Sequence, residues 1–255
     1  MSPGRDAFLN VETSLTGRRW IGPGAEALRL SEAMGQETGL SDPLCRLLVA
    51  RGVPASDAPA YLKPSLRDLL PDPMTLKDME PAAERLIRAV ERRERVAVFA
   101  DYDVDGGASA ALLTDWSRQL GVTPTLYVPD RIDEGYGPNP EAMSALAADH
   151  DLIVCVDCGT LSFDAIAAVK DADVVVLDHH LGGETLPEAL AVVNPNRQDE
   201  SGDLGHLCAA AVVFLVLVDA NRRLRSKGGA PPDLLAMLDL VALATVADVA
   251  PLVGV

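Results

Sequence analysis

The chain has 255 residues, of which 48% are hydrophobic and 24% charged, a composition typical of an ordered globular protein. Its formal net charge of −16 excludes binding of nucleic acid through an overall basic surface, but it allows a local basic groove, because salt screens charges beyond about 10 Å. The N-terminus lacks the apolar core of a signal peptide, and the longest apolar run, 207–218, is shorter than the roughly 20 residues that span a bilayer. We therefore expect a cytoplasmic protein without a membrane partner.

Residues 1–80 differ from the rest of the chain in composition and in their pattern of apolar residues. They are rich in Pro and Gly, and no strong strand pattern occurs among them. Short helices are expected over 43–51 and after Asp57, which is a suitable helix cap. We predict an irregular helical N-terminal segment.

From residue 81 onward, helical patterns alternate with short apolar runs. Strands are expected over 96–99, 125–128, 152–156, 173–177 and 191–193. Helices are expected over 81–93, 107–120, 139–148, 162–170, 207–225 and 232–245. Short, wholly apolar strands between helices are typical of a parallel sheet with helices on both faces. The prediction is an α/β domain over 81–255.

Acidic side chains follow three of these predicted strands. Asp101, Asp103 and Asp105 come after the first, Asp157 after the third, and Asp-His-His at 178–180 after the fourth. The carboxyl ends of parallel strands meet at one edge of a sheet, and carboxylates gathered there repel one another unless a cation is present. If Asp101, Asp103 and Asp105 lie on an extended segment, their spacing of two residues places all three side chains on one face. Carboxylate and imidazole ligands suit Mn²⁺ or Mg²⁺ better than Zn²⁺.

Each motif also has a simpler explanation when taken alone. The acidic run at 101–105 could be a solvated turn, and the two histidines a partly buried pair. Asp248 could cap a helix N-terminus, and Arg131 could pair with Asp130 or Glu134 on the surface. The Cys-x-x-Cys motif at 155–158 could bind zinc or act in redox chemistry, but its place at a strand end favours buried thiols.

Taken in order, the motifs at 101–106, 157–159 and 178–180 resemble those of the DHH phosphoesterase superfamily. The stronger resemblance is to its RecJ family of single-stranded-DNA-specific exonucleases. Further stretches carry that resemblance over nearly the whole chain: 51–53, 66–73, 129–137, 193–197 and 239–252. The chain departs from the family pattern at 107–108 and at 206–211.

The resemblance implies roles for individual residues. The implied metal ligands are Asp101, Asp103, Asp105, Asp157, His179 and Asp248. Asp157 would bridge two Mn²⁺ or Mg²⁺ ions, and Asp157 and His180 are the implied catalytic residues, His180 as the group that orients or protonates the reacting phosphate. Arg131 and Tyr136 would handle the substrate strand, Arg131 by pairing with a phosphate.

The implied activity is 5′-to-3′ hydrolysis of single-stranded DNA by a metal-activated water, in DNA repair and recombination. The implied partners are single-stranded DNA and other repair or replication proteins. The chain stops soon after a predicted helix, and the family's DHH-associated and OB-type domains have no counterpart in it. We therefore expect an N-terminal catalytic portion that carries the metal site and half of the substrate cleft, and that does not digest DNA processively by itself.

Two alternatives stay open at this point. One is a DHH phosphoesterase that acts on short oligonucleotides or cyclic dinucleotides. The other is a non-catalytic DHH scaffold, but such relatives lose their metal ligands, whereas all the expected ligands are present here.

Overall fold

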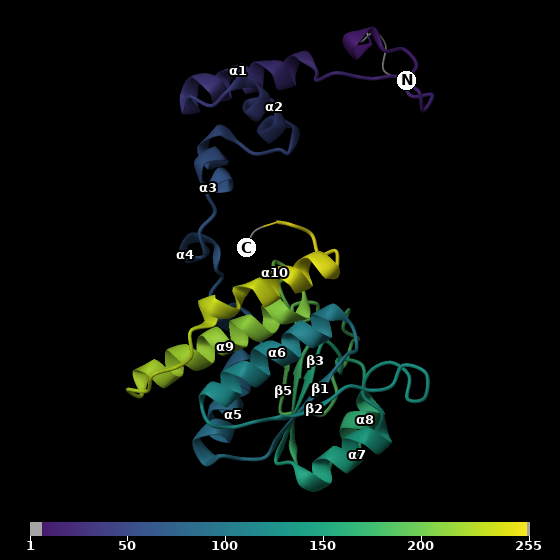
Figure 1. Ribbon diagram of the computed structural model, residues 1–255, viewed down its shortest axis with the longest axis vertical. Helices are drawn as coiled ribbons and strands as arrows, with labels where there is room; N and C mark the ends of the chain where they lie inside the picture. The colour runs from purple at the N-terminus through teal and green to yellow at the C-terminus, as the bar shows by residue number, and fades with distance from the viewer. Residues whose placement is uncertain (1–6, 254–255) are drawn as a thin grey trace. The chain divides into compact units, whose positions relative to one another are not determined.

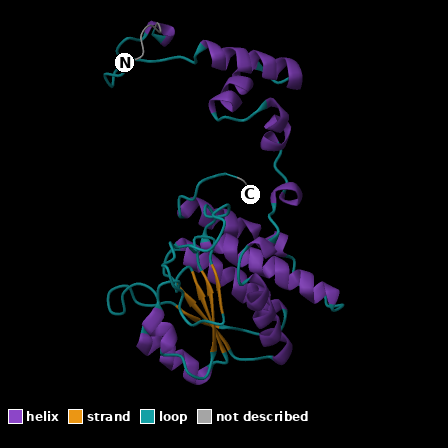
Figure 2. Ribbon diagram, turned by 180° about the vertical axis from the view of Figure 1, so that it is seen from behind, coloured by secondary structure: helices purple, strands orange, loops and turns teal. Residues whose placement is uncertain are grey.

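The computed structural model describes residues 7–253, shown in Figures 1 and 2. The chain divides into two compact units, the first ending at Leu70 and the second beginning at Pro71. The division predicted after residue 80 falls inside the first long helix of the second unit. Among the described residues, no helix combines the length and the apolar character that a membrane span requires.

The first unit consists of helices and turns. Its elements are η1 (Phe8–Asn10), α1 (Ala25–Thr38), α2 (Asp42–Ala50), η2 (Ala55–Asp57), α3 (Ala58–Leu62) and α4 (Leu66–Leu69). Buried Met34, Cys45 and Leu48 form the small core between α1 and α2. The predicted helical character is confirmed, although α1 is longer than any helix expected there. Asp57 occupies the predicted N-cap position of α3, but within the described chain its carboxylate accepts a hydrogen bond from the Ser56 hydroxyl and none from a helix amide.

The second unit is built on a five-stranded parallel sheet with strand order β2-β1-β3-β4-β5. Its strands are β1 (Val96–Ala100), β2 (Thr125–Tyr127), β3 (Leu152–Val156), β4 (Asp173–Leu177) and β5 (Ala191–Val193). Ala100 pairs with Val156, and Val156 with Leu177, so β1, β3 and β4 end at the same level. Every residue of β1 and β3 is buried, as expected for strands covered on both faces.

Helices cover both faces of this sheet (Figure 1). They are α5 (Met79–Arg92), α6 (Val104–Gln119), α7 (Pro140–Asp149), α8 (Phe163–Ala167), α9 (Ala209–Ser226) and α10 (Leu238–Ala247), with turns η3 (Pro73–Thr75) and η4 (Leu234–Met237). On one face, Met143 of α7 and Ile166 of α8 pack against Phe99, Ile153 and Val176. The opposite face lies toward α5, α6 and α9. The predicted α/β fold is confirmed.

Helix α6 begins earlier than predicted, and this changes the arrangement of the acidic run. Asp103 caps the helix, because its Oδ1 accepts a hydrogen bond of 2.9 Å from the Gly106 amide. Asp105 therefore lies in the first helical turn and not on an extended segment. The expectation that Asp101, Asp103 and Asp105 share one face is wrong, since the cap turns the backbone at Asp103.

Gly106 brings the first turn of α6 against the end of β1. A Cβ atom on Gly106 would lie 2.4 Å from the Asp101 carbonyl oxygen, whereas one on Gly107 would meet nothing within 4 Å. We predict that Gly106→Ala lowers the free energy of unfolding by about 3 kcal/mol, because two backbone segments would have to separate. Gly107→Ala should raise it by about 0.5 kcal/mol, because alanine favours the helix. Urea unfolding followed by circular dichroism measures both effects, and equal stability of the two variants would contradict the close approach.

Candidate metal centre

The side chains that the sequence singled out converge at the carboxyl edge of the sheet. Asp101 follows β1, Asp103 and Asp105 begin α6, Asp157 follows β3, His179 and His180 follow β4, and Asp248 follows α10. Their ligand atoms form three groups, each with its atoms within 4.8 Å of one another: Asp157 with His179 and His180, Asp105 with His179 and Asp248, and Asp101 with Asp103 and Asp157. Asp157 and His179 each belong to two groups, so the three groups make one continuous cluster.

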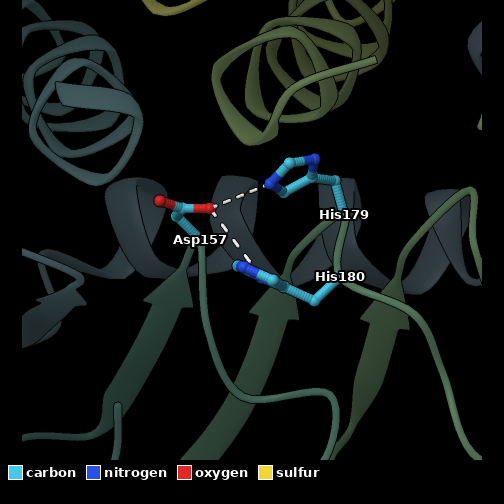
Figure 3. Close-up of side chains that lie close together, drawn as sticks. All are labelled: Asp157, His179 and His180. Atoms are coloured by element: carbon cyan, nitrogen blue, oxygen red, sulfur yellow. Dashed lines mark ion pairs between the residues drawn. The ribbon is translucent and has the colours of Figure 1, made fainter. Parts of the chain in front are cut away.

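Asp157 lies between the other members of the cluster. Its Oδ1 is 3.3 Å from His179 Nε2 and 4.0 Å from His180 Nδ1 (Figure 3). Its backbone φ is +59°, in the left-handed region that aspartate tolerates better than most residues. This turn after β3 brings the carboxylate to the edge of the sheet, facing the two histidines.

Two buried carboxylate oxygens in the cluster have no hydrogen-bond partner among residues 7–253. They are the Oδ1 atoms of Asp101 and Asp157, both in side chains that are almost completely buried. A buried charged oxygen without a donor is costly, and a bound cation removes that cost. These atoms are the clearest sign that the cluster is shaped for a metal ion.

The electrostatics of the cluster point the same way. Burial raises the pKa of Asp157 to about 7, helped by the charges of Asp105 and Asp103 and opposed by the contact with His179. Burial also raises the pKa of Asp101 and Asp105. Burial alone would lower the pKa of His179, but its contact with Asp157 and the surrounding carboxylates outweigh this and raise it to about 9. The centre therefore attracts protons, as expected of a site that cations would neutralise.

Asp105 also anchors helix α9. Its two carboxylate oxygens accept hydrogen bonds of 2.6 and 2.8 Å from the amides of Ala209 and Ala210, the first residues of that helix. A helix N-terminus favours a negative charge, so this contact holds the carboxylate in place. The same side chain approaches His179 Nε2 to 3.7 Å, which links the start of α9 to the cluster.

Asp178, one of the strand-end acids expected at this edge, received no individual role from the sequence; it belongs to none of the three ligand groups found among residues 7–253 and fixes the turn that carries both histidines. Its Oδ1 accepts hydrogen bonds from the amides of His179 and His180 and, at 2.7 Å, from His180 Nδ1, while its Oδ2 accepts one from the Thr160 amide. Burial opposes ionisation, but the hydrogen bonds from His180 and Thr160 outweigh it and hold the pKa of Asp178 at about 2. The signal was present in the Asp-His-His motif, because an aspartate directly before two histidines can reach their amides.

Tyr136 and Arg131 lie in the loop that follows β2, and Tyr136 contacts His180. The Tyr136 hydroxyl is 3.1 Å from His180 Nε2. The Tyr136 ring meets the Tyr102 ring edge-on, and the Arg131 guanidinium lies 5.2 Å from the centre of the Tyr102 ring. The loop thus brings Arg131 and Tyr136 against Tyr102, which lies between β1 and α6, and Tyr136 joins this group to His180.

Three of the simpler explanations do not match the structure. Asp130 and Glu134 bind neighbouring amides of their own loop, and within the described chain neither forms an ion pair with Arg131. Asp248 comes at the end of α10, so it does not cap a helix N-terminus. All four cysteines are buried free thiols, and none belongs to the ligand groups found among residues 7–253.

Comparisons with known proteins identify the family of this chain. Residues 95–245 match the model of the DHH family, N-terminal domain. The chain is 40% identical over 219 residues to the single-stranded-DNA-specific exonuclease RecJ of Salmonella typhimurium, a match that covers 82% of this chain and 37% of that protein. The chain therefore spans well under half the length of this curated relative.

Two solved structures are similar to the chain. A RecJ exonuclease bound to manganese shares 36% identity with a TM-score of 0.62, over 70% of this chain and 45% of that one. RecJ of Thermus thermophilus in complex with Mn²⁺ shares 30% identity with a TM-score of 0.69, over 91% of this chain and 32% of that one. The resemblance inferred from the motifs is confirmed.

Asp178 and Asp157 should respond differently to the same substitution in protein without added metal. Asp178→Asn places an amide donor among N–H groups, so we predict a loss of about 2 kcal/mol in the free energy of unfolding. Asp157→Asn removes the ion-pair contact with His179 but also the repulsion from Asp105 and Asp103, and it keeps a residue that tolerates a positive φ, so the net change should stay below about 1 kcal/mol. Urea unfolding of both variants in a chelating buffer measures this difference. A larger loss for Asp157→Asn would contradict the assigned roles.

Proposed function

This chain belongs to the DHH family, and we propose that it is the N-terminal catalytic portion of a metal-dependent exonuclease that degrades single-stranded DNA from 5′ to 3′. The observation that carries the proposal is the continuous cluster in which Asp157 joins two ligand groups. The names of the relatives support the substrate class. Because the chain spans 37% of the Salmonella protein, processive digestion would require parts of the substrate cleft from outside this chain.

The donor set fits two Mn²⁺ or Mg²⁺ ions. Asp101 and Asp103 would hold one ion, Asp105, His179 and Asp248 the other, and Asp157 would bridge them. Hard carboxylate oxygens with one imidazole suit these metals, and the unpaired Oδ1 atoms of Asp101 and Asp157 would gain a partner. When bound, the ions would activate a water molecule and stabilise charge on the phosphate.

The remaining side chains would act on the substrate itself. His180 is oriented through Nδ1 by Asp178, which leaves Nε2, beside the Tyr136 hydroxyl, to orient or protonate a phosphate oxygen. The Arg131 guanidinium would pair with a phosphate of the strand, and its position over the Tyr102 ring would limit its motion. Arg131 would supply a single local cation for this contact, in a loop that also carries Asp130, Asp133 and Glu134.

Several finer assignments belong to this proposal. We propose a DHH domain at 81–255 after an N-terminal segment at 1–80. We also propose a role in DNA repair and recombination, with other repair or replication proteins as partners. A cytoplasmic location stays a prediction from the sequence.

The first test is calorimetric titration of Mn²⁺ into the chain. We predict two bound ions for the unchanged chain and loss or marked weakening of both in Asp157→Ala, because one carboxylate serves both ions. Asp115→Ala is the matched control. The carboxylate of this exposed aspartate on α6 accepts a hydrogen bond from Gln119 and from no other side chain among residues 7–253, so the variant should bind Mn²⁺ as the unchanged chain does. One weak ion that is insensitive to Asp157→Ala would overturn the binuclear centre.

Hydrolysis is then measured with the chain in excess over substrate, so that weak binding does not hide the chemistry. An end-labelled single strand should be shortened from its 5′ end in Mn²⁺, and a duplex of the same sequence should stay intact. Cleavage of dinucleotides or cyclic dinucleotides alone would identify the small-substrate phosphoesterase. Metal binding without any hydrolysis would favour the scaffold.

Arg131→Ala tests how the strand is held. We predict about tenfold weaker binding of single-stranded DNA for every sequence, because a phosphate contact is lost. The slope of log K against log salt should fall by about one. Fluorescence anisotropy of a labelled strand gives both quantities, and Mn²⁺ affinity should not change. An unchanged salt slope would remove Arg131 from the phosphate-binding role.

A further inference from the structure

Asn194 and Asn196, which follow β5, form hydrogen bonds to the backbone of His180 and His179. Asn194 Nδ2 donates hydrogen bonds of 2.8 Å to the His180 carbonyl oxygen and to the Thr160 hydroxyl. Asn196 Nδ2 donates to the His179 carbonyl oxygen. Each histidine of the cluster is therefore held through its own carbonyl by a different asparagine.

The two asparagines also hold each other. Asn194 Oδ1 accepts a hydrogen bond of 2.7 Å from the Asn196 amide, and Asn194 is completely buried. The Asn196 carbonyl oxygen accepts a hydrogen bond of 3.0 Å from the Gly182 amide, so the loop that follows the two histidines is held as well. Because these donors and acceptors are paired, the hydrogen-bond network holds the two asparagines in a single conformation.

Asn196 further connects the histidine turn to the segment that leads into α9. Its Nδ2 lies 3.3 Å from the Gly205 carbonyl oxygen. A Cβ atom on Gly205 would come within 2.7 Å of Asn196 Oδ1, so the two segments pack in direct contact. The first amides of α9 bind Asp105, and Asn196 thus stands between two residues assigned to the same metal ion.

We propose that Asn194 and Asn196 are positioning residues that set His179 and His180 for the metal centre. The inference rests on the proposed function, because it assigns the asparagines to that centre. A histidine ring rotates about only two side-chain bonds, so its direction depends on the backbone that carries it. Because the carbonyls of His179 and His180 are both held by hydrogen bonds, the turn presents the two rings in one direction. Groups that orient metal ligands in this indirect way typically change metal affinity 10-fold to 100-fold when removed.

Asn196 is the position to test, because removing completely buried Asn194 would endanger folding. We expect Asn196→Ala to weaken Mn²⁺ binding about 10-fold or more. Asn196→Asp keeps the shape but turns a donor into an acceptor that faces two carbonyl oxygens, so it should weaken binding at least as much. Calorimetry on the whole 255-residue chain measures both affinities.

Arg197→Leu is the matched control. The Arg197 guanidinium bonds Asp78, Asp199 and the Val192 carbonyl oxygen in the same segment, and no bond joins it to either histidine among residues 7–253. Its loss should lower thermal stability and leave Mn²⁺ affinity within about twofold of the unchanged chain. If the three variants lose affinity in proportion to their loss of stability, Asn196 has only a structural role and the proposal is overturned.

A measurement without metal separates this inference from the proposed function. Proton–nitrogen correlation spectra of the histidine rings are recorded on the metal-free chain. Asn196→Ala should shift or broaden the His179 ring signals, and Arg197→Leu should leave them unchanged. Unaltered signals in Asn196→Ala overturn the positioning role, even if the unchanged chain binds Mn²⁺. Altered signals support the positioning role, even if the unchanged chain binds no Mn²⁺. The absence of Mn²⁺ binding would count against the proposed function alone.

Discussion

Repulsion between buried carboxylates at one edge of the sheet is the constraint on which the rest of the second unit depends. Parallel strands of nearly equal end level bring Asp101, Asp157 and Asp178 to that edge, where water is largely excluded. Charges this close in a medium of low polarity favour protonation or a cation. The surrounding structure must therefore supply either donors or metal ions.

The fold meets this constraint differently for different aspartates. Asp105 and Asp178 are satisfied by N–H groups, the first by the start of α9 and the second by a turn and a histidine ring. Asp101 and Asp157 each keep an oxygen without a hydrogen bond among residues 7–253, and that of Asp157 has only ion-pair contacts with the two histidines. This division separates carboxylates that hold the fold together from those left for a cation.

The same side chains connect the fold to the proposed metal site. Asp105 belongs to both classes, because it anchors α9 and faces His179. The asparagine pair after β5 extends the coupling, since it ties the histidine turn to the segment before α9. A metal ion bound at this edge would therefore stabilise the contacts between sheet, turn and helix.

The sequence alone determined the strands, the parallel sheet and the residues that gather at its edge, because apolar runs and strand-end acids are local patterns. It did not determine which of those residues share a face: the cap at Asp103 starts α6 early and moves Asp105 to the group with Asp248. Nor did it assign work to Asp178 or Asn196, whose partners are amides and carbonyls that only chain packing brings within reach. Apart from proline, which has no N–H, every residue carries the same backbone donor and acceptor, so only the tertiary structure decided which of them meet these side chains.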